Sequence, residues 1–138
     1  MITAIDTNIL LDILTADETF CDGSATAIES SVTAGSLVIC DFVYAELCVH
    51  FRSQRECDAF LNENQIRVEA LTKQAHFLAS RAWRTYRKQG GQRTRILADF
   101  LIGAHAELQA SRLLSRDRSF YGKIFPSLNL YDPSAKGS

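Results

Sequence analysis

Positive charge is missing from the first third of this 138-residue chain, where no Lys or Arg precedes Arg52. A secretory signal begins with a positively charged segment, and Asp6 interrupts the short apolar opening of this sequence. No apolar run approaches the ~18 residues that suggest a membrane-spanning helix. We therefore expect a cytoplasmic protein.

Paired metal-ligand spacings are also absent. The four cysteines form no C-x-x-C pair, and the three histidines form no H-E-x-x-H pattern. Free cysteines are usually buried as small apolar side chains. The sequence thus argues against a zinc site, and it predicts free, buried thiols at Cys21, Cys40, Cys48 and Cys57.

Proline is scarce, with two residues, and no Pro-rich or Gly-rich stretch divides the chain. The apolar fraction of 46% and the charged fraction of 22% are ordinary for a globular protein. A chain of 138 residues also fits the usual size of one domain. We expect a single domain over residues 1–132 and a polar C-terminal tail at 133–138.

Charge is distributed unevenly along the chain. Residues 1–51 carry eight acids and no Lys or Arg, whereas the remainder holds all 15 basic residues. Seven cations and no acid lie between Glu69 and Asp99. A basic surface beside acidic residues suits a metal-dependent enzyme that acts on a phosphate polyanion. An ordinary solvated helix face explains the same charge run, and this alternative stays open.

Strand-like and helix-like segments alternate, which predicts an α/β fold with a mainly parallel sheet. Expected strands are 2–5, 37–39, 66–68, 113–114 and 128–130. Expected helices are 42–49 with Asp41 as its cap, a helix from Thr72 to Gly90-Gly91, and 97–110.

Four acids stand where a strand-like run gives way to a helix-like one: Asp6, Glu46, Asp99 and Asp117. Carboxylates at such positions can converge at one edge of a parallel sheet. Their mutual repulsion would favour a bound cation, and oxygen ligands without Cys or His favour Mg²⁺ or Mn²⁺. Each acid also has a simpler explanation, as a helix cap, an exposed helical residue, a partner of a helix dipole or a turn residue.

Three stretches of sequence carry a family resemblance. They are the opening Asp6-Thr7-Asn8-Ile9-Leu10-Leu11-Asp12, the run from Arg95 to Ala106 around Asp99, and the run from Leu113 to Tyr121. Together with Glu46, they resemble the PIN-domain ribonucleases over nearly the whole chain, from Ile2 to about Leu130. Within that family the sequence is most similar to the VapC toxins of bacterial toxin-antitoxin pairs.

The resemblance implies a three-layer α/β/α PIN-like fold with a central, mainly parallel sheet of four or five strands. It also implies that the four acids bind Mg²⁺ or Mn²⁺ and activate water to cleave RNA. Asp6 and Asp99 are expected as direct metal ligands, Asp117 would complete the sphere, and Glu46 would hold a metal-bound water or act as general base. A VapB-like antitoxin and a homodimer are the implied partners.

Further roles follow from the same resemblance. Asn8 and Ser115 are expected to orient the acids. Ser119 stands where some members carry another acid, which leaves the number of metal ions open. The candidates for contact with RNA phosphates are Arg93, Arg95, Arg116 and Arg118.

Other functions fit parts of the pattern. An aspartate-nucleophile phosphatase normally has a second acid two residues after the first, where this chain has Asn8. A phosphoacceptor receiver domain typically has paired acids after its first strand. The alternative of a different class is a catalytically silent PIN-fold module that binds RNA or protein.

Overall fold

The computed structural model describes residues 1–91 and 96–134, and its centre is a parallel sheet in the order β3-β2-β1-β4-β5. Every neighbouring pair of strands is parallel, as expected for βαβ units. The strands are β1 (Ile2–Ile5), β2 (Ser36–Cys40), β3 (Ile66–Glu69), β4 (Arg112–Leu114) and β5 (Leu130–Tyr131). The predicted α/β class and the five-stranded parallel sheet are confirmed.

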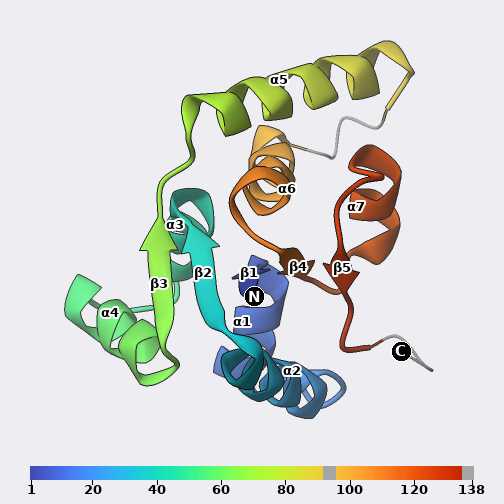
Figure 1. The fold of residues 1–138 in the computed structure, drawn as a ribbon. Helices are drawn as coiled ribbons and strands as arrows, with labels where there is room; N and C mark the ends of the chain where they lie inside the picture. Colours follow the sequence, from blue (N-terminus) through green and yellow to red (C-terminus); the bar gives the residue numbers. More distant parts are fainter. Residues whose placement is uncertain (92–95, 135–138) are drawn as a thin grey trace.

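Seven helices flank the sheet in the described part of the chain (Figure 1). They are α1 (Thr7–Leu14), α2 (Cys21–Ala34), α3 (Asp41–Cys48), α4 (Gln54–Glu63), α5 (Lys73–Lys88), α6 (Leu97–Gln109) and α7 (Arg118–Ile124). The predicted helices α3, α5 and α6 are confirmed. The sequence did not predict α2, α4 or α7.

The helix ends show which local rules hold. The Thr72 hydroxyl accepts a hydrogen bond from the Ala75 amide at 3.2 Å, so it caps α5 as predicted. Gly90, with φ of 76°, follows the end of that helix in the left-handed region that glycine adopts readily. The predicted cap at Asp41 is wrong, because Asp41 is the first residue of α3 and Cys40 precedes it without a capping side chain.

The central strands are buried on both faces. Thr3, Ala4 and Ile5 of β1 are buried at consecutive positions, as are residues 37–40 of β2. Successive strand residues point to opposite faces, so continuous burial means that helices cover both. In Figure 1, α1 lies with α2, and α5 runs across α6, with which it packs most extensively.

The strand order reverses beside β1, which has β2 on one side and β4 on the other. Ligands of open α/β sheets bind beyond the carboxyl ends of the strands at such a reversal. Asp6 follows β1 there, and its amide donates a hydrogen bond of 2.9 Å to the Leu114 carbonyl at the end of β4. The fold therefore brings residues 6 and 115 to the same edge of the sheet.

None of the helices described here combines the length and the apolar character that crossing a membrane requires. The tail expected at 133–138 lies largely outside the described residues, which end at Ser134.

Candidate functional site

Asp6 is the anchor of the candidate site and is only 7% exposed. It precedes α1 in an extended conformation, and its Oδ1 accepts the Thr7 amide at 2.7 Å. Its Oδ2 accepts the Ser115 hydroxyl at 2.8 Å. Both carboxylate oxygens are thus held by donors from the two strand ends that meet at the reversal.

Asn8 and Ser115, the two residues expected to orient the acids, both contact this carboxylate. The Asn8 amide nitrogen lies 3.4 Å from both Asp6 Oδ2 and Ser115 Oγ. Ser115 is 1% exposed, and its Oγ also accepts the Asp117 amide at 3.0 Å. One hydroxyl therefore orients Asp6 and fixes the backbone of Asp117 at the same time.

Glu46 reaches the site through Thr7. The Thr7 hydroxyl donates a hydrogen bond of 2.8 Å to Glu46 Oε1, and it joins the start of α1 to α3. Thr7 is buried whereas Glu46 is exposed, so this contact lies at the boundary between the protein interior and solvent. Because the Thr7 amide also donates to Asp6 Oδ1, Thr7 connects the two acids in one continuous network.

Burial raises the pKa of Asp6 to about 6, opposed by hydrogen bonds from Ser115, Thr7 and Tyr121 and assisted by the negative charge of Asp99. Asp99 lies in the first turn of α6, as predicted. Repulsion by Asp99 is the smallest of these influences on the pKa of Asp6, after burial and the three hydrogen bonds. A cation placed between the two carboxylates would relieve both the repulsion and the cost of burying Asp6.

Tyr121 is a member of the site that the sequence did not predict. It lies on α7, is 1% exposed and forms a hydrogen bond with Asp6. Burial and the charges of Asp6, Asp99 and Asp117 raise its pKa well above 10, so the phenol stays protonated as a donor. The charges of three of the four predicted acids therefore act on the Tyr121 hydroxyl, and Asp117 lies directly before the helix that carries Tyr121.

The four predicted arginines occupy different places. The Arg116 guanidinium is held by buried Asp12, and its contact with RNA phosphate stays a prediction. Arg118 is exposed and lines an open hollow beside α7 and β5. Arg93 and Arg95 lie outside the described residues.

The donor set suits Mg²⁺ or Mn²⁺ better than a softer metal. Asp6, Asp99 and Asp117 offer hard carboxylate oxygens, and Asp6 accepts its hydrogen bonds from Thr7, Ser115 and Tyr121. Within residues 1–91 and 96–134, however, the acids do not converge as a ready group of three metal ligands. The fit therefore lies in the chemistry of Asp6 and its neighbours, not in a finished coordination cage.

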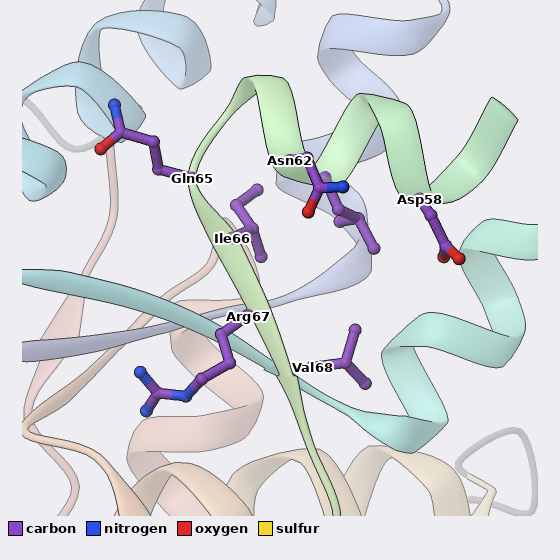
Figure 2. Close-up of a pocket in the computed structure, with 7 residues that line it drawn as sticks. Asp58, Asn62, Gln65, Ile66, Arg67 and Val68 are labelled. Atoms are coloured by element: carbon purple, nitrogen blue, oxygen red, sulfur yellow. The ribbon is translucent and has the colours of Figure 1, made fainter. Parts of the chain in front are cut away.

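A separate hollow of about 500 Å³ lies between α4 and β3. Figure 2 shows Asn62 and Asp58 on the helix, with Arg67 and Val68 on the strand below it. None of the four predicted acids lines this hollow. It is distinct from the network around Asp6.

Comparison with known proteins places this geometry in a family. The PIN domain family model matches residues 3–124, and no curated protein matches the sequence. VapBC2 from Rickettsia felis, solved with promoter DNA, is similar at a TM-score of 0.75 and 20% identity, covering 96% of this chain and 98% of that one.

Two other solved structures have the same fold. VapBC-1 from nontypeable Haemophilus influenzae has a TM-score of 0.74 and 22% identity, covering 98% of this chain and 100% of that one. DNA-bound VapBC from Salmonella typhimurium has a TM-score of 0.72 and 14% identity, covering 96% and 98%. The predicted family is confirmed: this chain belongs to the PIN domain family.

Proposed function

We propose that this protein is a Mg²⁺- or Mn²⁺-dependent endoribonuclease, and that it is the toxin of a VapBC-type toxin-antitoxin pair. The observation that carries the proposal is the Asp6 carboxylate, which is buried at the reversal of the strand order and bonded to Ser115. Burial makes a negative charge costly there and raises the pKa of Asp6 to about 6, which supports a role for this carboxylate beyond the fold. A divalent cation is the partner that this site suits.

Each site residue then has a chemical role. Asp6 and Asp99 would hold the metal, and Asp117 would complete its surroundings. When bound, the cation supplies charge that stabilises the developing negative charge on phosphate, and it makes water a better nucleophile. Glu46 would take the proton from the attacking water, with Thr7 fixing one of its carboxylate oxygens.

The hydroxyl and amide donors keep this arrangement in place before substrate arrives. Ser115, Asn8 and Tyr121 all donate toward Asp6, so its orientation does not depend on the metal. Pre-set donors of this kind reduce the reorganisation that the reaction requires.

RNA is the proposed substrate because basic residues stand close in sequence to two of the acids, Asp99 and Asp117. Arg118 is exposed one residue after Asp117. Arg93 and Arg95 precede the helix that carries Asp99, and we propose that they bind phosphates away from the scissile one. The double change Arg93→Ala with Arg95→Ala is expected to weaken RNA binding and flatten its salt dependence while Mn²⁺ affinity stays unchanged.

The proposed partners are a VapB-like antitoxin and a second copy of this chain, in the cytoplasm. The similar structures from R. felis, H. influenzae and S. typhimurium are VapBC proteins, which supports an antitoxin. We also propose that residues 1–132 act as a single PIN domain. An antitoxin that places Arg or Lys against the carboxylates would substitute for the metal.

The test of the toxin role is growth. Expression of the chain alone should arrest growth, Asp99→Ala should not, and co-expression of the cognate antitoxin should restore growth. If the wild-type chain is harmless and copurifies with no partner, the toxin role is wrong even where RNA cleavage persists.

A catalytically silent PIN module that binds RNA or protein is the second candidate. It is favoured by one observation, that the acids of the described residues do not form a ready group of three metal ligands. RNA binding without cleavage at saturating Mn²⁺ would identify this module.

A further inference from the structure

Two cysteines touch each other away from the acidic network. Cys48 is the last residue of α3, Cys57 lies in α4, and their sulfur atoms are 3.9 Å apart. Cys57 is fully buried and Cys48 is partly exposed. One thiol of the pair is thus partly open to solvent, and the other is buried in contact with it.

A second contact joins the same two helices. The Tyr44 hydroxyl donates a hydrogen bond of 2.7 Å to Asp58 Oδ1, one residue after Cys57. This contact fixes α3 against α4 on the same side as the cysteines. The two sulfur atoms therefore stay neighbours in the folded protein.

We propose that Cys48 and Cys57 form an oxidation site, in which a peroxide converts the two thiols into an intrachain disulfide. The Cys48 sulfur attacks hydrogen peroxide, which gives a sulfenic acid and one water. The Cys57 sulfur then displaces the sulfenic oxygen, which leaves as a second water with the Cys57 proton. In total, two thiols and one peroxide give one disulfide and two waters.

The geometry requires a modest movement. A disulfide has a sulfur–sulfur length of about 2 Å, so the gap of 3.9 Å must close by roughly 2 Å. Cys48 ends its helix and is followed by the short connection 49–53, so the chain can shift there without unwinding α4.

The order of the two steps follows from exposure. Burial, together with the Cys48 contact, raises the pKa of Cys57 to about 11, so this thiol is protonated at neutral pH and is a poor first nucleophile. Cys48 meets the peroxide first, and Cys57 acts on the sulfenic acid already in contact with it. The bond formed would tie the helix that carries Glu46 to α4.

Intact mass after peroxide treatment of the purified full chain tests this inference, independently of the nuclease proposal. We expect a mass loss of two hydrogen atoms, two fewer thiols that react with an alkylating reagent under denaturing conditions, and reversal by dithiothreitol. The thermal midpoint should also rise in the oxidised protein, because the cross-link restricts the unfolded chain.

Matched variants assign the bond. Cys48→Ser, at the partly exposed position, should abolish the mass loss, and Cys57→Ala should abolish it as well. Cys21→Ser should leave the mass loss unchanged, because Cys21 lies at the start of α2 and is not one of the two sulfur atoms in contact. Addition of oxygen to Cys48 without loss of hydrogen, a disulfide that persists in Cys48→Ser, or a link between two chains would each overturn the inference.

Discussion

Arg116 and Asp12, 104 residues apart in sequence, form a two-point ion pair in which Nε and one terminal nitrogen of the guanidinium each lie 2.8 Å from a carboxylate oxygen. Asp12 is 4% exposed and also accepts the Ser24 hydroxyl at 2.8 Å. The guanidinium lies 3.8 Å from the centre of the Phe20 ring. Arg116 thereby joins the segment between Ser115 and Asp117 to α1 and α2.

This pair predicts a large difference between two neighbouring arginines. Arg116→Ala leaves the buried Asp12 charge without its partner and should lower the free energy of unfolding by about 3 kcal/mol. Arg118→Ala, at an exposed position, should change it by less than about 0.5 kcal/mol. Urea denaturation of both variants provides the measurement, and equal losses would show that the pair does not stabilise the fold.

The raised pKa of Asp6 predicts how metal-free stability changes with pH. The folded pKa of about 6 exceeds the ordinary 3.8, so the folded protein binds a proton more tightly than the unfolded chain. The resulting stability is present below pH 4 and is lost as the pH rises to 6, by about 3 kcal/mol.

Asp6→Asn should remove this loss, since the amide does not ionise. The stability of Asp6→Asn relative to wild type should therefore increase between pH 4 and pH 6 and stay constant above it. Denaturant unfolding in a chelator gives the two curves, with Asp22→Asn, at an exposed position of α2, as the control. Parallel curves for wild type and Asp6→Asn would contradict the pKa assignment.

The bond from Thr7 to Glu46 predicts a selective loss of activity. Thr7→Val keeps the side-chain shape but removes the donor to Glu46, and a hydrogen bond to a charged group contributes about 1.5 kcal/mol or more, so cleavage should slow about tenfold. Thr7→Ser retains a hydroxyl and should keep most of the rate. Cleavage rates of the two variants at saturating Mn²⁺ test this prediction. Equal rates for Thr7→Val and Thr7→Ser would show that Thr7 does not orient Glu46.

Gly103 predicts a packing requirement behind the site. A Cβ at this position of α6 would lie 2.3 Å from the ring of Phe125, which is 2% exposed and has little room to move. Gly103→Ala should cost about 1–3 kcal/mol of stability through overpacking. At Gly122 the nearest atom to a new Cβ is 3.8 Å away, so Gly122→Ala should be close to neutral. Thermal unfolding compares the two, and a neutral Gly103→Ala would contradict this packing.

The sequence predicted those parts of the structure that depend on local pattern. Thr72 caps α5 because its hydroxyl acts three residues away, and the apolar stripe of α5 follows directly. The sequence did not predict α2, because small and polar residues form much of the buried face of this helix. Ser24 and Ser31 lie there beside Ala27 and Ile28. Such a helix has few large apolar residues whose spacing could reveal it in the sequence.

The site was predictable to a similar extent. Asp6 and Ser115 were named from sequence, and the structure bonds them directly. The role of Tyr121 could not be predicted, because an aromatic residue beside Phe120 is expected in the core, and only the fold brings its hydroxyl to Asp6. The ion pair of Arg116 with Asp12 could not be predicted, because 104 residues separate the two in the chain, and contact of Arg116 with RNA phosphate stays a prediction.

Cleavage of a defined RNA by wild type and Asp6→Ala, each with Mn²⁺ and with excess chelator, is the decisive measurement. Wild type should cleave only with metal, and Asp6→Ala should lose cleavage. In the absence of metal, Asp6→Ala should melt at a temperature no lower than wild type, because it lacks a buried carboxylate that Asp99 repels. Full cleavage by folded Asp6→Ala, or cleavage that continues in chelator, would contradict a metal-dependent nuclease centred on Asp6.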